Sequence, residues 1–314
     1  MVKLMQLYAF VVFAAFTMFE ASAAPFAYVP NEGSGTISVI DTANDEVVAE
    51  IPAGKKPRGL GISGSVLYVS DQPNNRLQMI DLNKREPAGT IALGESPEGV
   101  CVSPDGNWVA VAIEESNDVA ITDTKTNKVA FNIKVRGRNP EHAVFSPDGK
   151  KLFVSAEEGD AVDIIDFTTR KQIAQIPVGA RPRGIGFLPD GSRAYVATEN
   201  SGEVYVIDTA SNKLITHIKA GLKANGIAVH PNGTRVYVSN GGDASVSVID
   251  TADNKIIATI PVGQRPWNMA ITPDGKKLYV ANGRSNTVSV IDTVKNNKIR
   301  DVGVGKLPWG VVIK

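Results

Sequence analysis

The sequence has little of the chemistry that defines many metal and redox proteins. The 314-residue chain has one cysteine, Cys101, and three histidines. One cysteine cannot close an intrachain disulfide, and a chain without Cys-x-x-Cys has no attachment site for c-type haem, no thiolate zinc ribbon and no dithiol redox pair. Three histidines leave little room for a multi-histidine metal site. We therefore expect no cofactor and no metal.

Charge of one sign is also lacking. The 33 Lys and Arg residues balance the 33 Asp and Glu residues, so the formal net charge is zero. This removes the whole-chain electrostatic argument for binding nucleic acid or an acidic membrane. The sequence has no Gly-x-Ser-x-Gly elbow, Walker loop, dinucleotide fingerprint or His-Glu-x-x-His motif. An apolar content of 43% predicts an ordinary globular protein.

The only long apolar run lies at the start of the chain. Lys3 precedes the apolar residues 4–19, and Ala21-Ser22-Ala23 follows. A basic start, an apolar run and an Ala-x-Ala site are typical of a secretory signal peptide. The alternative is a membrane anchor, but the run is shorter than the about 20 residues needed to span a bilayer. We predict a signal peptide over residues 1–23, a single domain over 24–314 and a location in the periplasm or outside the cell.

A repeat fills the rest of the chain. An Ile-Asp-Thr-like step recurs at spacings of 40 to 43 residues, at Asp41, Asp81, Asp123, Asp166, Asp208, Asp250 and Asp292. A proline recurs in the same period at Pro57, Pro97, Pro140, Pro182, Pro266 and Pro308, with Ala224 in its place in one unit. Each unit holds four short, β-branched runs separated by Pro-Asp-Gly or Asn-Asn-Lys turns. This period and strand number predict an all-β, seven-bladed β-propeller with four-stranded blades.

The chain ends indicate how the ring closes. The mature chain starts with the second, third and fourth strands of a unit, at 26–51, and ends with a lone first strand, at 308–313. We expect the C-terminal strand to complete the N-terminal blade, which leaves no free sheet edge inside the ring.

Functional residues are sought where the units differ from one another. The loops that lead into the first strands and the loops after the second strands should meet at one face, the channel mouth. The residues after the proline position are Arg58, Glu98, Glu141, Arg183, Asn225, Trp267 and Trp309. The loops after the second strands add Glu114, Glu157 and Glu199. His142 replaces the glycine that most units carry at the next position.

The residues at this mouth can be interpreted as functional, in catalysis or in binding, or as structural. The catalytic candidates are Glu98, Glu141 and His142, because facing carboxylates could raise the pKa of a histidine or share a cation with it. The binding candidates are Arg58, Arg183, Asn225, Trp267, Trp309, Glu114, Glu157 and Glu199. The alternative is structural: charged side chains on a rim are commonly solvated, and the two tryptophans could pack under neighbouring loops.

Several units carry a recognisable family pattern. The segments Tyr237-Val238-Ser239-Asn240 and Tyr279-Val280-Ala281-Asn282, with Val-Ser-Val-Ile-Asp-Thr at 246–251 and 288–293, resemble the YVTN-family β-propeller repeat. The size, the leader and the segments 265–267 and 307–310 are similar to the exported propellers associated with pyrroloquinoline-quinone-dependent alcohol catabolism. That resemblance implies an accessory role in periplasmic alcohol oxidation or transport. It supplies no site motif that can be matched here.

Three functions compete at this stage. The first is an exported binding or scaffold protein, expected to be a monomer, that recognises a periplasmic protein or a small molecule at the mouth. The second is a lactonase- or lyase-like enzyme that uses Glu141 and His142. The third, less favoured because the net charge is zero, is a nucleic-acid binder that uses a modest basic patch of Lys55, Lys56, Arg58, Arg181 and Arg183.

Overall fold

The computed structural model describes residues 25–314. The predicted signal peptide and its cleavage site lie outside these residues. Within the described part of the chain, no helix is long and apolar enough to cross a membrane.

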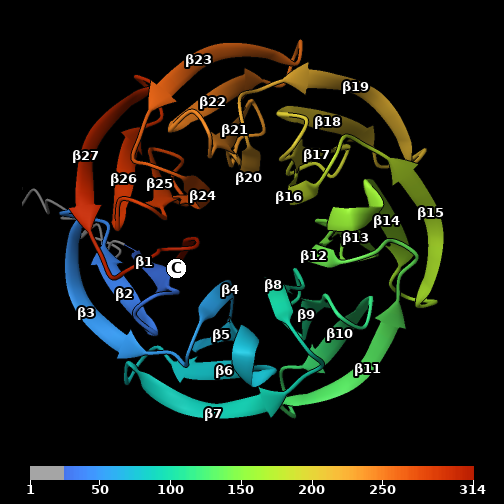
Figure 1. Ribbon diagram of the computed structural model, residues 1–314, viewed down its shortest axis with the longest axis horizontal. Helices are drawn as coiled ribbons and strands as arrows, with labels where there is room; N and C mark the ends of the chain where they lie inside the picture. The colour runs from blue at the N-terminus through green and yellow to red at the C-terminus, as the bar shows by residue number, and fades with distance from the viewer. Residues whose placement is uncertain (1–24) are drawn as a thin grey trace, which may run out of the picture.

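Seven four-stranded antiparallel sheets stand around a central channel, as Figure 1 shows. We number them as blades 1 to 7 from the N-terminus. Blade 1 contains β28 (Val312–Ile313), β1 (Phe26–Asn31), β2 (Thr36–Asp41) and β3 (Glu46–Pro52). Blades 2 to 4 contain β4 (Pro57–Ser63), β5 (Val66–Asp71), β6 (Arg76–Asp81), β7 (Glu86–Ala92), β8 (Pro97–Val102), β9 (Trp108–Ile113), β10 (Asp118–Asp123), β11 (Lys128–Lys134), β12 (Pro140–Phe145), β13 (Lys151–Ala156), β14 (Ala161–Asp166) and β15 (Lys171–Pro177). Blades 5 to 7 contain β16 (Pro182–Phe187), β17 (Arg193–Thr198), β18 (Glu203–Asp208), β19 (Lys213–Lys219), β20 (Ala224–Val229), β21 (Arg235–Asn240), β22 (Ser245–Asp250), β23 (Lys255–Pro261), β24 (Pro266–Ile271), β25 (Lys277–Asn282), β26 (Thr287–Asp292) and β27 (Asn297–Gly303). The predicted seven-bladed propeller is confirmed.

The strand pattern follows from burial. Second and third strands such as β21 and β22 are buried along nearly their whole length, because each blade packs on a neighbour at both faces. The outermost strands, such as β23, alternate between exposed and half-buried residues. Most turns between third and fourth strands place an asparagine at positive φ, as at Asn254 (56°) and Asn296 (52°), and the others place Asp45, Arg85 or Arg170 there. Asparagine tolerates this left-handed conformation better than most residues.

The asparagine at the end of the repeated Tyr-Val strand lies beneath a loop on the mouth face and supports it. In blade 6, Asn240 Nδ2 donates to Ser245 Oγ at 3.0 Å and to Ser247 Oγ at 2.9 Å. A Cβ atom at Gly221, in the loop above, would lie 2.6 Å from the Asn240 side chain. The loop that leads to the next first strand therefore needs glycine at this point, because only glycine allows so close an approach.

The ring closes as predicted, with a shorter last strand. Tyr28 pairs with Val312 and Ala27 with Ile313. Pro308 forms a separate bridge with Asn31. The strand predicted over 308–313 is interrupted, as the pairing of other first strands is: in β24 the register shifts between Pro266 and Met269.

Polar clamps connect neighbouring blades. A basic residue at the start of one second strand reaches the turn between the third and fourth strands of the next blade; for example, Arg193 Nη1 donates to Thr251 O at 2.7 Å. The Tyr195 hydroxyl donates to Asn254 Oδ1 in that turn at 2.8 Å. At the junction of blades 7 and 1, Lys277 and Tyr279 hold Asp45 instead of an asparagine.

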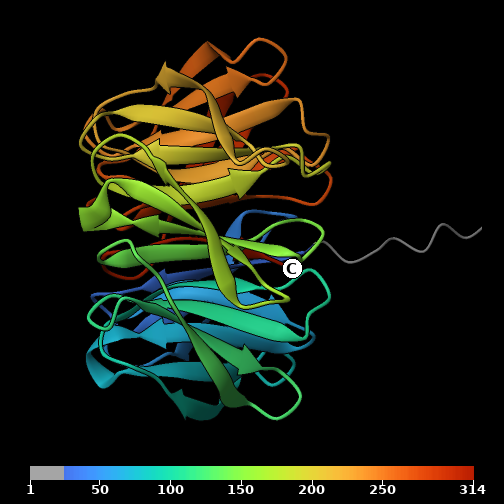
Figure 2. The same ribbon diagram turned by 90° about the vertical axis from the view of Figure 1, so that its right-hand side faces the viewer.

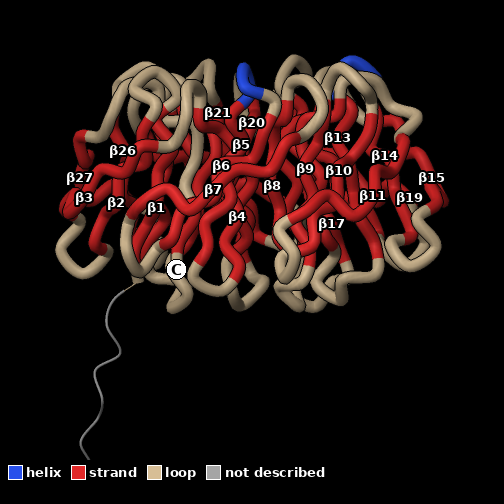
Figure 3. Tube along the Cα trace, turned by 90° about the horizontal axis from the view of Figure 1, so that it is seen from below, coloured by secondary structure: helices blue, strands red, loops and turns tan. Residues whose placement is uncertain are grey.

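The two faces of the ring differ. The short 3-10 helices η1 (Gln72–Asn74) and η2 (Glu157–Gly159) lie in loops on the mouth face, and the C-terminus lies on the opposite face (Figures 2 and 3). The C-terminus therefore does not obstruct the mouth.

Candidate functional site at the channel mouth

The first residues of the innermost strands surround the channel at the mouth. The second residue of the strand is Arg58 in β4, Glu98 in β8, Glu141 in β12 and Arg183 in β16. The next residue is usually glycine, and it brings neighbouring strands together. A Cβ atom at Gly59 would lie 2.3 Å from the Glu98 carbonyl oxygen. This packing draws the side chains of different blades into one cluster.

The cluster is an alternating network of guanidinium and carboxylate groups. Arg183 contacts Glu141 at 2.7 Å, Glu157 at 2.7 Å and Glu199 at 2.9 Å. Arg58 contacts Glu98, and Glu32 at 3.3 Å. Two further arginines complete the network: Arg265 contacts Glu199 at 2.8 Å, and Arg181 contacts Glu157 and Glu199.

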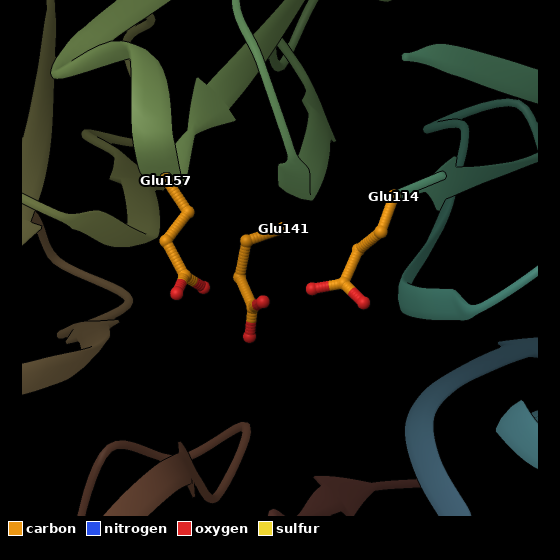
Figure 4. Close-up of side chains that lie close together, drawn as sticks. All are labelled: Glu114, Glu141 and Glu157. Carbon is orange, nitrogen blue, oxygen red and sulfur yellow. The ribbon is translucent and has the colours of Figure 1, made fainter. Parts of the chain in front are cut away.

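Three carboxylates converge in this network. Figure 4 shows the side chains of Glu114, from blade 3, and of Glu141 and Glu157, both from blade 4, pointing into the same space. Ligand oxygens of the three lie within 4.8 Å of one another. Ser96 Oγ donates to Glu114 at 2.5 Å, and Arg183 neutralises the other two. Such a group can hold protons or a cation.

The network separates the proton affinities of its carboxyl groups. Burial raises the pKa of Glu98 to about 9, and the neighbouring Glu141 adds to the shift. Burial also raises the pKa of Glu157, to about 7, although Arg183 opposes this shift. Burial acts to raise the pKa of Glu141 too, but Arg183 and Arg58 outweigh it, so this pKa is lowered. Glu141 and Glu157 both contact Arg183 Nη1 at 2.7 Å. Glu157 is therefore a group that exchanges a proton near neutral pH beside an ionised partner.

A cavity of about 370 Å³ opens above this network, and we call it the mouth cavity. It is lined by Arg58, Gln72, Glu114, Asn139, Glu141, Glu157, Glu158, Arg181, Arg183, Asn225, Arg265, Trp267 and Trp309. The Arg265 guanidinium lies over the Trp267 ring, 5.9 Å from its centroid. The cavity thus combines charged groups, the Asn225 amide and an aromatic wall, a lining that suits a small polar ligand.

A stacked pair of rings crosses the channel. His142 comes from blade 4 and Trp309 from blade 1, and their ring centroids lie 5.6 Å apart at an interplanar angle of 15°. Both rings line a second space of about 140 Å³ inside the channel, which shares Arg58 and Trp309 with the mouth cavity. The stack therefore narrows the channel at the inner side of the mouth cavity.

The pKa of His142 does not follow the prediction that facing carboxylates could raise it. The pKa of His142 is instead lowered, because burial outweighs the attraction of Glu141. The imidazole is therefore neutral at pH 7. It lines the channel space, whereas Glu141 and Glu157 line the mouth cavity.

The solvated-rim interpretation is wrong for much of the glutamate column. Glu157 is 8% exposed, Glu199 3% and Glu98 0%. Carboxylates are so deeply buried only when paired or protonated, and these are held by arginines. The pairing also removes Arg58 and Arg183 from the basic patch considered for nucleic acid. Trp309 is 9% exposed and packs inside the mouth instead of standing on the rim.

The sequence comparison of units missed part of the site. Arg181 and Arg265 stand immediately before Pro182 and Pro266, outside the two sets of positions compared between units. Gln72 occupies the position that Glu114, Glu157 and Glu199 hold in other units, and its amide donates to Glu98 Oε1 at 2.8 Å. Arginines in the loop before the first strand, facing a glutamate column, were the signal that could have found the network.

The fold and the site together define a seven-bladed propeller with a charged cavity at one mouth of its channel. Residues 136–303 match the family model described as the seven-bladed β-propeller lactonase, and the chain belongs to this family. A comparison with curated proteins finds no match.

Solved structures share the fold at low sequence identity. Hydrazine synthase of Kuenenia stuttgartiensis has a TM-score of 0.79 at 21% identity, over 90% of this chain and 99% of that one. A protein of unknown function from Desulfotomaculum acetoxidans has a TM-score of 0.80 at 17% identity, over 92% and 99%. A candidate 6-phosphogluconolactonase from Bacteroides uniformis has a TM-score of 0.78 at 21% identity, over 93% and 100%. At these low identities, the similarities show a shared fold alone.

Proposed function

We propose that this protein hydrolyses a small cyclic ester, a lactone, in the mouth cavity. The observation that carries the proposal is Glu157. Its carboxyl group has a pKa of about 7, shares Arg183 with the ionised Glu141 and lies in the cavity wall. A proton-transfer group works best when its pKa is close to the working pH. Membership of the lactonase family supports the same reaction.

The proposed reaction uses Glu157 as base and then as acid. Ionised Glu157 takes a proton from a water molecule, whose oxygen bonds to the carbonyl carbon of the lactone. The ring carbon–oxygen bond then breaks, and the ring oxygen receives the proton back from Glu157. The product is a hydroxy acid, and Glu157 is ionised again.

Two neighbours support this step. Asn225 lines the same cavity, and its amide can donate to the oxyanion that forms on the carbonyl oxygen. Arg183 contacts both Glu141 and Glu157 at 2.7 Å. It holds Glu141 ionised and keeps Glu157 from a still higher pKa. Arg183 thus acts through these carboxylates as a positioning residue.

The test is lactone hydrolysis by purified protein, corrected for the spontaneous reaction. We expect Glu157→Gln to lower kcat by about 100-fold or more, since general acid–base catalysis contributes about that much. In the unaltered protein, kcat should rise with pH through about 7, the pKa of Glu157. Glu95→Gln is the matched control, because Glu95 is exposed in a loop on the same face. Unchanged hydrolysis in Glu157→Gln, or no hydrolysis of any lactone in a broad panel, would refute the proposal.

A second candidate is binding at the mouth without turnover. It is favoured by the ion pairing of all four arginines in the network, an arrangement that stable structural networks share. In that case Trp267→Ala would weaken ligand binding, and no substrate would turn over. Export and an accessory role in quinone-linked alcohol oxidation remain predictions, which co-purification with periplasmic dehydrogenases would test.

A further inference from the structure

The charges of the mouth cavity limit the substrates that it can accept. We propose that the cavity binds uncharged, hydroxylated lactones and excludes those that carry a phosphate or carboxylate group. This inference rests on the proposed function, because it names the substrate class of the same site.

The guanidinium groups are already engaged. Arg58 holds Glu98 and Glu32, with its Nε and both terminal nitrogens in contact with these carboxylates. Arg183 holds three glutamates through Nε and Nη1. Arg265 and Arg181 hold Glu199 and Glu157. Phosphate and carboxylate ligands are recognised by paired N–H donors of a guanidinium fork. An anion would have to displace a glutamate that the fold keeps in place.

Carboxylates also outnumber guanidiniums. The network contains four arginines, Arg58, Arg181, Arg183 and Arg265, and six glutamates, Glu32, Glu98, Glu114, Glu141, Glu157 and Glu199. Glu98 has one carboxyl oxygen, Oε2, that is buried without a hydrogen-bond partner among the described residues. The surplus is offset by bound protons, as the raised pKa of Glu98 indicates. An anionic group would add a negative charge that only further bound protons or a displaced glutamate could offset.

Uncharged hydroxyl groups fit the same lining. A hydroxyl donates to a carboxylate and accepts from a guanidinium or amide, and the cavity presents both kinds of partner. The aromatic wall at Trp267, half-buried beside Arg265, offers a face for the carbon skeleton. The volume of about 370 Å³ lies at the small end of known ligand cavities.

The charge surplus also affects the product. Hydrolysis turns an uncharged ester into a hydroxy acid whose carboxyl group is ionised at neutral pH. The product therefore carries the charge that the cavity disfavours, and we expect its release to be fast and its inhibition weak.

The experiment is calorimetric titration of the purified protein with three probes: glucono-1,5-lactam, an uncharged and non-hydrolysable mimic, then gluconate and inorganic phosphate. We expect the lactam to bind and the two anions to bind at least about tenfold more weakly, the loss expected when a charged hydrogen bond goes unmade. Glu199→Gln should free guanidinium donors, because Glu199 contacts Arg183 at 2.9 Å and Arg265 at 2.8 Å. This variant should gain about tenfold in phosphate affinity. Glu95→Gln should gain none.

The outcomes separate this inference from the proposed function. Equal or tighter binding of phosphate or gluconate by the unaltered protein would overturn it, as would Glu199→Gln with no gain in phosphate affinity. Failure of the lactam to bind would overturn the part that concerns uncharged ligands. Glu157→Gln, which frees Arg181, repeats the test if Glu199→Gln does not fold. These are equilibrium measurements, so they stand even if no lactone is turned over.

Discussion

Replacing Arg183 by methionine should destabilise the protein in a way that depends on pH. The Arg183 side chain is 14% exposed and contacts carboxylates that are 5%, 8% and 3% exposed. Arg183→Met keeps most of the length of the side chain but leaves these three carboxyl groups without their shared cation. Removing one partner of a buried ion pair costs about 3 to 5 kcal/mol. We expect a loss of about 3 kcal/mol in the free energy of unfolding at pH 8. This is the lower end of the range, because the carboxyl groups can take up protons.

The sign of the pH dependence follows from the carboxyl groups. In the unaltered protein the pKa values of Glu141 and Glu199 are lowered, so their contribution is present above the unfolded pKa and is lost as pH falls through the folded value. Without Arg183, burial should raise the pKa of Glu141, whereas Glu199 keeps its contacts with Arg265 and Arg181. The folded variant then loses stability as pH rises. The difference between the two proteins should therefore shrink from pH 8 to pH 5, to less than about half.

Urea unfolding followed by tryptophan fluorescence at pH 8, 6.5 and 5 measures this difference. Arg284→Met is the matched control, because Arg284 is exposed on the same face, and it should change stability by less than about 0.5 kcal/mol. A difference that stays constant with pH, or that grows toward pH 5, would refute the electrostatic reasoning. So would a loss at pH 8 below about 1 kcal/mol.

Two further predictions concern the ring. Trp309→Ala should lower the free energy of unfolding by about 3 kcal/mol, because it removes a buried ring that stacks on His142. Trp267→Ala should lower it clearly less in the same urea titration, because the Trp267 ring is half-buried. Equal losses in the two variants would contradict the burial assigned to these rings. Deleting residues 306–314 removes β28 and exposes the edge of β1, so thermal unfolding followed by circular dichroism should lose its single cooperative transition. An unchanged melting temperature would count against closure by the last strand.

The fold could be predicted because the same pattern of strands and turns recurs in seven units of the sequence. The recurring aspartate and proline columns gave the blade number, and the incomplete units at the two ends gave the closure. The positions at the mouth were predicted for the same reason: residues at one place in the repeat lie at one level of the ring. This identified Glu98, Glu141, Glu157, Glu199 and Arg183 as neighbours.

The partners within the mouth could not be predicted. Arg265 reaches Glu199 across 66 residues, and Trp309 crosses the channel to His142 in a blade that is not its neighbour. These contacts depend on side-chain rotamers and lengths, about which a repeat period says nothing. Burial of the glutamates also went unpredicted. A glutamate in a loop suggests exposure, and its burial is stabilised here by arginines, several of which come from other blades.

The clamp at the junction of blades 7 and 1 has a consequence for the entropy of closing the ring. Elsewhere, Tyr195 reaches Asn254 over 59 residues, whereas Tyr279 reaches Asp45 over 234. Joining ends over four times the chain length costs about 1.2 kcal/mol more, at about 0.6 kcal/mol per doubling. Asp45 replaces the usual asparagine and also pairs with Lys277 at 2.9 Å. A hydrogen bond to a charged group contributes about 1 kcal/mol more than a neutral one. The change from asparagine to aspartate is thus of the size needed to offset the longer loop. It lies beside blade 1, the blade in the described ring whose first two strands, β28 and β1, are joined by strand pairing instead of a connecting turn.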